Sequence, residues 1–152
     1  MPITLSMNFE DVSMTKLDPI IGTWKLNVAR SRFPSPQFTF KQQTEVYQEI
    51  GDGRIELTYK SIDINGASTL EIFVFPAQGG AADVLKEQIA GRSYIETKIN
   101  PNEWLATCLE GGKQLYVLRK LISKDGRTLI KTPGSTDEQG NSPDLYLVLE
   151  RQ

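Results

Sequence analysis

The chain lacks the side chains on which much enzyme chemistry depends: its 152 residues include no histidine and one cysteine, Cys108. Histidine is the commonest general base and metal ligand, so its absence excludes a Ser-His-Asp or Cys-His nucleophile and most zinc sites. A single cysteine excludes an internal disulfide and gives no sign of an oxidising compartment. We therefore expect no metal and no cofactor, and we interpret Cys108 as a small buried residue.

A strong excess of charge is also lacking, because 17 basic residues accompany 19 acidic ones and the formal net charge is −2. A nucleic-acid-binding surface needs a basic excess, so we expect no nucleic-acid partner. No apolar run approaches the roughly 18 residues of a membrane span. The start of the chain, with Glu10, Asp11 and Asp18, has neither the basic region nor the apolar run of a secretory signal. We therefore expect a cytoplasmic protein.

What the chain does contain is an alternation of β-rich runs and turn residues. Asn65-Gly66, Gly111-Gly112 and Asp125-Gly126 are hairpin signals between runs rich in Val, Ile, Thr and aromatic residues. No apolar period of 3.6 residues is sustained, so no long helix is predicted. The pattern predicts an all-β fold with antiparallel strands at 22–28, 38–50, 54–63, 68–75, 93–100, 104–110, 114–123, 127–132 and 143–151.

Nine strands cannot close an all-antiparallel barrel, because the last strand would run parallel to the first. A tenth strand is therefore needed, and 84–90 is the unassigned stretch that can supply it. Its charged residues have poor strand propensity, which leaves closure with eight strands or a short helix at 81–89 as alternatives. The prediction is a single antiparallel up-and-down β-barrel of 8–10 strands that occupies residues 18–152.

Residues 1–17 precede the barrel as an N-terminal extension. It is either a terminus that does not pack, or a lid or plug that packs Leu5, Phe9 and Val12 onto the barrel. Two runs of the barrel, 69–75 and 115–122, are apolar on both faces, and their outer faces would be buried by such an extension or by a second subunit. A homodimer is therefore one arrangement that we consider.

The first predicted strand carries a motif. Residues 18–27, DPIIGTWKLN, place an Asp-Pro turn before a Gly-x-Trp strand. This stretch resembles the opening of the calycin superfamily, the lipocalins and fatty-acid-binding proteins, in which a short 3-10 turn leads into the strand that closes the barrel floor. The longer stretch GTWKLNVARSRF, together with SKDGRT at 123–128, is similar to a group of uncharacterised bacterial lipocalin-like proteins.

In calycins an Arg or Lys of the last strand lies across this tryptophan, and the resemblance implies the same contact between Trp24 and Arg151. Ten alternating strands return Arg151 to the end of the barrel that holds Trp24, on the inward face that it shares with Leu149. We predict a structural clasp with a cation–π contact of about 0.5–2 kcal/mol. The chain lacks the helix pair and the Arg-x-Tyr clamp of fatty-acid-binding proteins, which argues against a fatty acid held by that clamp.

The period of two along a strand assigns the faces. In 38–50 the even-numbered residues are predicted to face inward, and in 54–63 and 93–100 the odd-numbered residues are. The run 115–122 has no clear orientation, so Arg119 faces the interior only if its strand is turned that way. The long connections at 29–37 and 133–142 are predicted to lie at the rim opposite Trp24.

The inward positions are apolar with polar interruptions, and an unpaired buried polar group costs on the order of a few kcal/mol. We infer an interior cavity that holds water or a ligand, with buried polar networks as the alternative. The predicted ligand-binding residues are Phe38, Phe40, Gln42, Thr44, Tyr59, Ser61, Thr97, Trp104 and Arg119.

Two functions fit such a barrel, because the fold does not decide between them. The first is binding of a small hydrophobic or amphipathic molecule inside the barrel. The alternative is a cofactor-free cyclase or isomerase of a natural-product pathway, which needs a shaped pocket and one acid or base. Tyr59 and Asp63 are the candidate catalytic residues for that alternative.

Overall fold

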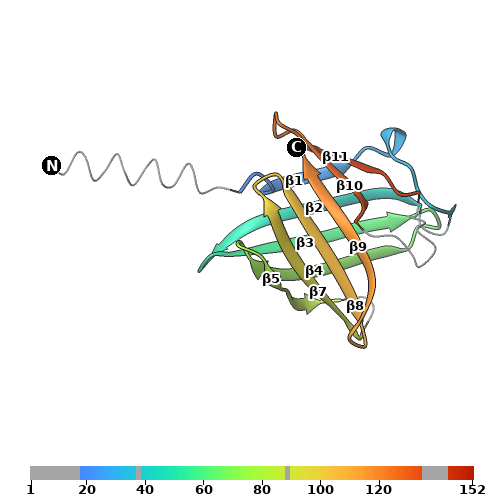
Figure 1. The fold of residues 1–152 in the computed structure, drawn as a ribbon. Helices are drawn as coiled ribbons and strands as arrows, with labels where there is room; N and C mark the ends of the chain where they lie inside the picture. The colour runs from blue at the N-terminus through green and yellow to red at the C-terminus, as the bar shows by residue number, and fades with distance from the viewer. Residues whose placement is uncertain (1–17, 37–38, 88–89, 135–143) are drawn as a thin grey trace.

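A single antiparallel sheet curls into a nearly closed barrel in the computed structural model of the chain (Figure 1). The structure describes residues 18–36, 39–87, 90–134 and 144–152. The walls formed by β2–β4 and β7–β9 lie on opposite sides and cross at a steep angle (Figure 1). Within the described residues, no helix is long and apolar enough to cross a membrane. The predicted all-β barrel is confirmed, while the extension at 1–17 lies outside the described residues.

The barrel contains 11 strands, more than the 8–10 predicted. Its neighbours follow the order β5-β7-β8-β9-β10-β11-β1-β2-β3-β4-β6. The bounds are β1 (Gly22–Leu26), β2 (Phe40–Gly51), β3 (Arg54–Asp63), β4 (Ser68–Pro76), β5 (Gly80–Ala81), β6 (Asp83–Lys86), β7 (Arg92–Asn100), β8 (Glu103–Glu110), β9 (Lys113–Ile122), β10 (Thr128–Pro133) and β11 (Leu147–Arg151), with a 3-10 helix η1 (Val28–Arg30) after β1.

The segment 80–86 joins the two edges of the sheet. β5 pairs with β7 on one side, and β6 pairs with β4 on the other. The chain changes partner at Ala82, whose backbone N–H donates to the carbonyl of Tyr94 at 2.9 Å. The stretch predicted as a tenth strand at 84–90 thus overlaps a shorter strand, β6, and the described residues of 81–89 form strands where the alternative predicted a helix.

The closed end of the barrel is built around Trp24. The turn expected before β1 is present, because the Ile21 N–H donates to the Asp18 carbonyl at 3.0 Å. Trp24 is fully buried and its Nε1 donates to the Ile20 carbonyl at 2.8 Å. These bonds fix the tryptophan of the Gly-x-Trp motif across the floor.

Arg151 completes this end, as predicted. Its guanidinium carbon lies 4.2 Å from the centre of a Trp24 ring. The guanidinium also donates three hydrogen bonds of 2.6 Å to backbone carbonyls, those of Pro19, Ile21 and Gly126. Gly22 is required beside it, because a Cβ there would collide with the guanidinium and the backbone φ is +139°. Arg151 therefore ties β11 both to the turn before β1 and to the turn between β9 and β10.

Along most of β2 the side chains that face inward are the ones that the sequence prediction placed outward. Gln43 and Tyr47 are buried, whereas Gln42 is exposed and Thr44 half-buried. The cause is a register shift between Phe40 and Gln42 in the pairing with β3. A bulge adds one residue to a strand and reverses its alternation, so Phe40 and Gln43 both face inward.

The prediction for β7 is also wrong. Glu96 is buried and Lys98 lies over an interior ring, whereas Ile95, Thr97 and Ile99 are on the outer surface. The prediction placed apolar residues inside, but the charged residues of this strand have interior partners. By contrast β3 is oriented as predicted, with its odd-numbered residues inward.

The outer side of β9 carries apolar side chains. Leu115 is exposed, whereas Ile122 of the same strand is buried in the core. The orientation that the sequence left open is thus settled, with the even-numbered residues Lys120 and Ile122 inward. Burial of the outer side by a second subunit stays a prediction.

Candidate functional site

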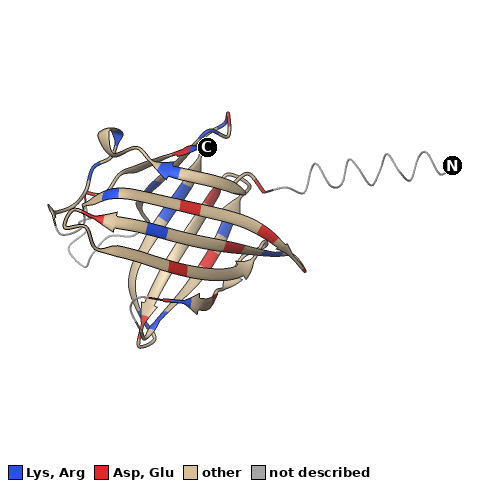
Figure 2. Cartoon of the chain, turned by 180° about the vertical axis from the view of Figure 1, so that it is seen from behind, with Lys and Arg blue, Asp and Glu red and all other residues tan. Residues whose placement is uncertain are grey.

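Six polar side chains from four strands meet inside the barrel, and each is at most 7% exposed. We call them the waist cluster: Gln43, Glu45 and Tyr47 of β2, Glu96 of β7, Lys120 of β9 and Lys131 of β10. Seen from behind, charged residues recur along the strands of the barrel as well as in its turns (Figure 2). Buried charges are stable only when paired, so the contacts within the cluster decide what it can do.

Glu45 is fully buried and bonded through both carboxylate oxygens. Oε1 accepts from the Tyr47 hydroxyl at 2.6 Å. Oε2 accepts from Gln43 Nε2 at 2.7 Å and from Lys131 Nζ at 2.8 Å. Burial acts to raise the pKa of Glu45, but Lys131 and Lys120, with the hydrogen bonds, lower it below its ordinary value. Glu45 is therefore a charged carboxylate that accepts three hydrogen bonds from the protein.

Glu96 is bonded through one oxygen. Lys120 Nζ donates to Glu96 Oε1 at 2.8 Å and lies 5.1 Å from the centre of the Tyr47 ring. Burial, followed by the charges of Glu45 and Glu96, raises the pKa of Tyr47 well above its ordinary value. Tyr47 is thus a neutral donor that connects the two ion pairs.

Three buried polar atoms near or in the cluster have no hydrogen-bond partner among the described residues: Gln43 Oε1, Glu96 Oε2 and Trp104 Nε1. Trp104 is fully buried and is the register neighbour of Lys120. Leaving such an atom unpaired costs about 1–3 kcal/mol, and native proteins hold few of them. The waist therefore has two free acceptors and one free donor.

Apolar side chains enclose the cluster. Toward the closed end, the next inward residues are Ile122 on β9 and Leu129 on β10, both buried. Toward the rim the wall is aromatic, with Phe33 against Phe40 at 6.2 Å and Phe73 against Tyr94 at 4.8 Å between ring centres. The interior is thus polar at its waist and aromatic above it.

Four of the predicted ligand-binding residues belong to the interior. Phe40 packs against the core, Ser61 and Trp104 are buried, and Tyr59 faces inward between Glu45 and Glu71 in the strand register. Phe38 lies outside the described residues, as does most of the predicted rim loop 133–142.

The other four predicted residues do not face the interior, so their predicted orientation is wrong. Gln42, Thr44 and Thr97 lie on the outer side of their strands because of the reversed faces of β2 and β7. Arg119 also points outward, where its Nε lies 3.2 Å from Glu103 Oε2. These side chains cannot line the interior.

Tyr59 and Asp63 do not form the predicted acid–base pair. Asp63 Oδ1 accepts the backbone N–H groups of Asn65 at 2.8 Å and Ala67 at 2.9 Å, which fixes the turn after β3. Burial raises the pKa of Tyr59 well above its ordinary value, and its hydrogen bond with Ser61 does not offset this. Tyr59 therefore stays protonated at neutral pH, where it can serve as an acid or a hydrogen-bond donor but not as a base.

The sequence prediction missed all six waist residues. It assigned Gln43, Glu45, Tyr47 and Glu96 to the outer side of their strands and gave no orientation to Lys120 and Lys131. The sequence does contain a pattern that could have predicted the burial of the two lysines. Lys131 shares its strand face with Leu129, and Lys120 shares its face with Ile122 and Leu118. A lysine in an otherwise apolar face indicates a buried, paired charge.

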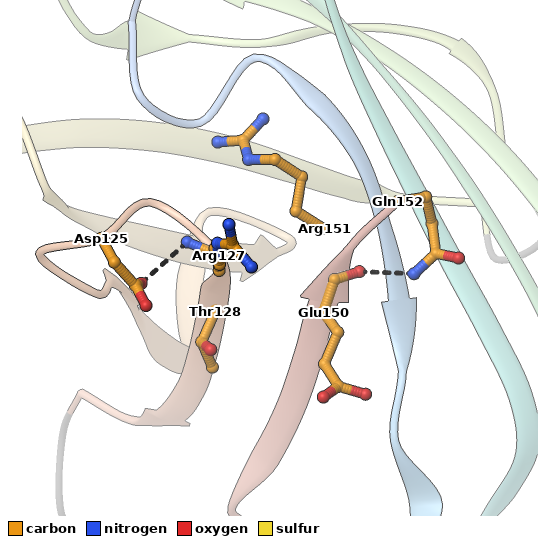
Figure 3. A pocket seen from close by; sticks show the side chains of 6 residues that line it. All are labelled: Asp125, Arg127, Thr128, Glu150, Arg151 and Gln152. Carbon is orange, nitrogen blue, oxygen red and sulfur yellow. Dashed lines mark hydrogen bonds between the residues drawn. The ribbon is translucent and has the colours of Figure 1, made fainter.

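Two hollows lie apart from the ion pairs. The larger, about 540 Å³, is at the closed end and is lined by Asp125, Arg127, Thr128, Glu150, Arg151 and Gln152 (Figure 3). Polar groups there bond locally, Asp125 to the Arg127 N–H and Gln152 to the Glu150 carbonyl (Figure 3). The smaller, about 140 Å³, lies over β2–β4, and its lining includes Gln43 and three of the predicted ligand-binding residues, Gln42, Thr44 and Ser61. Among the described residues no group of three or more Cys, Asp or Glu side chains could hold a metal ion.

Comparisons with known proteins identify the fold. No protein-family model and no curated protein matches the chain. A point mutant of the fluorescent protein UnaG is similar in structure, with a TM-score of 0.57 and 12% identity over 88% of this chain and 96% of that one. A biogenic amine-binding protein matches over 87% of this chain and 63% of its own, at 13% identity and a TM-score of 0.38. The chain therefore shares the barrel fold of the UnaG structure, which is the kind of fold that the resemblance of residues 18–27 implied.

Proposed function

We propose that the protein binds a small amphipathic molecule inside the barrel, with the polar end at the waist cluster and the apolar part against the aromatic wall. One observation carries this proposal: Gln43 Oε1 and Glu96 Oε2 are buried acceptors without a partner among the described residues. A ligand would offset the cost of leaving them unpaired.

The energetics of the ion pairs support the same function. Replacing a buried ion pair with apolar residues of similar size is often neutral or stabilising by about 1–4 kcal/mol. Stability alone therefore does not account for Glu45–Lys131 and Glu96–Lys120 in the interior. Barrels of similar strand number can enclose one small ligand, and a fixed polar waist would orient it.

Native mass spectrometry of the protein purified from expressing cells tests whether a small molecule is retained. In a second test the neutral dye Nile red, which fluoresces in apolar surroundings, is titrated into the protein. Tyr94→Ala removes a ring from the inner wall and should weaken dye binding about ten-fold. Ile95→Ala changes the neighbouring outward residue and should leave binding unchanged. Equal effects of the two substitutions, or no retained molecule and no dye binding, would overturn the proposal.

A further inference from the structure

The outward side of β7–β10, which we call the outer face, is apolar at its centre. The strand register places Ile95, Thr107 and Val117 side by side on this face. Leu105 and Leu109 flank Thr107 along β8, two positions away on either side, so they share its face. Ile95 is 37% exposed and Thr107 is half-buried, so water reaches this row in a single chain.

The wall of β2–β4 offers a matched row with different neighbours. There the register places Val46, Thr58 and Ile72 side by side, with Thr58 half-buried. The residues two positions away from Thr58 along β3 are Glu56 and Lys60, and charged residues recur along this wall (Figure 2). A protein partner would have to remove those charges from water, which is unfavourable. The outer face of β7–β10 is therefore the better docking surface of the two.

One ion pair lies within the outer face. Arg119 Nε is 3.2 Å from Glu103 Oε2, and the two side chains are 46% and 21% exposed. In the register of β8 and β9, Glu103 lies opposite Leu121 and Arg119 lies opposite Leu105, so leucines border the pair. Because water reaches both charges in a single chain, both are accessible to a partner.

The charges of this pair favour a second copy of the chain as the partner. Around a two-fold axis close to the pair, Glu103 meets the partner's Arg119 and Arg119 meets the partner's Glu103, so each charge gains an opposite neighbour. An unrelated protein would need the same two charges in the reverse order. Two sheets also pack face to face readily, with their strands within about 30° of each other.

The area of the outer face is sufficient for a weak dimer. Four strands about 4.8 Å apart, with about seven residues each at a rise of about 3.4 Å, cover roughly 450 Å² per copy. Two copies would therefore bury on the order of 1,000 Å², which is the lower limit for a specific interface. We expect a dissociation constant of about 10 μM for such a contact.

We propose that the protein forms a symmetric dimer in which the outer faces of two copies pack together, with Glu103 of each copy against the partner's Arg119. The row Ile95–Thr107–Val117 loses its contact with water in this dimer, which is the favourable contribution of apolar burial. The proposed ligand binding does not depend on this contact, because it uses the inward side chains.

Sedimentation velocity of the full chain, from ten-fold below to ten-fold above the expected dissociation constant, tests the dimer. Thr107→Lys and Thr58→Lys make the same change at the centre of the two matched rows. Thr107→Lys brings ammonium groups of two copies together and should weaken association ten-fold or more, whereas Thr58→Lys should leave it unchanged. Denaturant unfolding of both variants checks that each barrel is folded.

Charge reversal tests the two-fold axis. Glu103→Arg gives the outer face two cations and Arg119→Glu gives it two anions, so each variant alone should be monomeric. An equimolar mixture of the two variants should associate, because the face with two cations then meets the face with two anions. The double variant Glu103→Arg/Arg119→Glu should dimerise by itself, since it restores one charge of each sign.

A chain that is monomeric at every concentration would overturn the proposal. So would a dimer that Thr107→Lys and Thr58→Lys weaken equally, or that neither weakens, because the contact would then lie elsewhere. A mixture of the two charge variants that stays monomeric would overturn the pairing of Glu103 with the partner's Arg119. Nile red binding in the interior is a separate measurement, so a failure of the dimer leaves the proposed function standing.

Discussion

The two tryptophans of the barrel are both fully buried, yet their indole N–H groups differ. Trp24 at the closed end donates to the Ile20 carbonyl and is covered by Arg151. Trp104 packs edge-on against Phe75 at 5.5 Å, and its Nε1 has no partner in the described part of the chain. The hydrogen bonds around Trp24 at the closed end are complete, whereas those around Trp104 near the waist cluster are not.

The same contrast extends to the carboxylates. Asp18 at the closed end uses one oxygen for the Ile20 N–H and the other for Lys98 Nζ at 2.6 Å. Glu96 in the waist uses one oxygen and leaves the other free. A fully satisfied polar network rigidifies a fold, whereas an incomplete one calls for a further partner. The closed end is therefore structural, and the incomplete network of the waist supports our proposal that a ligand binds there.

The largest effect on stability is expected at the closed end. Trp24→Ala opens a cavity and removes the Ile20 bond and the Arg151 contact, so the free energy of unfolding should fall by about 5 kcal/mol. Lys25→Ala, on the exposed side of β1, should change it by less than about 0.5 kcal/mol. Denaturant unfolding measures both, and a loss below about 1 kcal/mol for Trp24→Ala would contradict a structural role.

In the waist, a single and a double replacement should lower the free energy of unfolding by different amounts. Lys131→Met leaves the Glu45 carboxylate buried without its ammonium and should cost about 3 kcal/mol of unfolding free energy. The double variant Glu45→Leu/Lys131→Met removes both charges but leaves the Tyr47 hydroxyl and Gln43 Nε2 without their acceptor, so it should recover only part of that loss. Its affinity for Nile red should also change. Equilibrium unfolding and dye titration test this pair, and a double variant as unstable as the single one would assign the ion pair to stability.

A smaller effect is expected in alkaline solution. The pKa of Tyr47 is raised in the folded protein, so its contribution to stability is complete below about pH 10 and is lost above it, where the unfolded phenol ionises first. Tyr47→Phe removes the phenol that ionises in the unfolded state but not in the folded state. Above pH 10 the fall in unfolding free energy should become shallower by about 1.4 kcal/mol per pH unit. Equal slopes for the two proteins would show that Tyr47 ionises freely in the folded state.

The sequence predicted the parts of the fold that depend on local signals. The turn residues and the period of two placed most strands, and the Gly-x-Trp motif predicted the contact between Trp24 and Arg151. The edge closure by β5 and β6 was harder to predict, because both strands are short and one contains glycine. Their pairing depends on the long strands at the two edges of the sheet, β7 for β5 and β4 for β6.

The site was less predictable because a single bulge decides which residues face inward. The register shift between Phe40 and Gln42 turns Gln43, Glu45 and Tyr47 toward the interior. Without that bulge, Gln42 and Thr44 would line the barrel, as predicted. Glu96 was missed for a different reason, since its partner Lys120 is 24 positions away on another strand.

The smallest effect is expected on the outside of β9, where Arg119 and Lys120 are neighbours in sequence but face opposite sides. The Arg119 side chain is 46% exposed and pairs with Glu103, so water screens the contact. Arg119→Gln should change the unfolding free energy by less than about 1 kcal/mol. Lys120→Gln should cost several times more, because Glu96 loses its ammonium inside the barrel. Thermal unfolding and probe binding compare the two variants, and similar behaviour would mean that burial does not distinguish the waist from the surface.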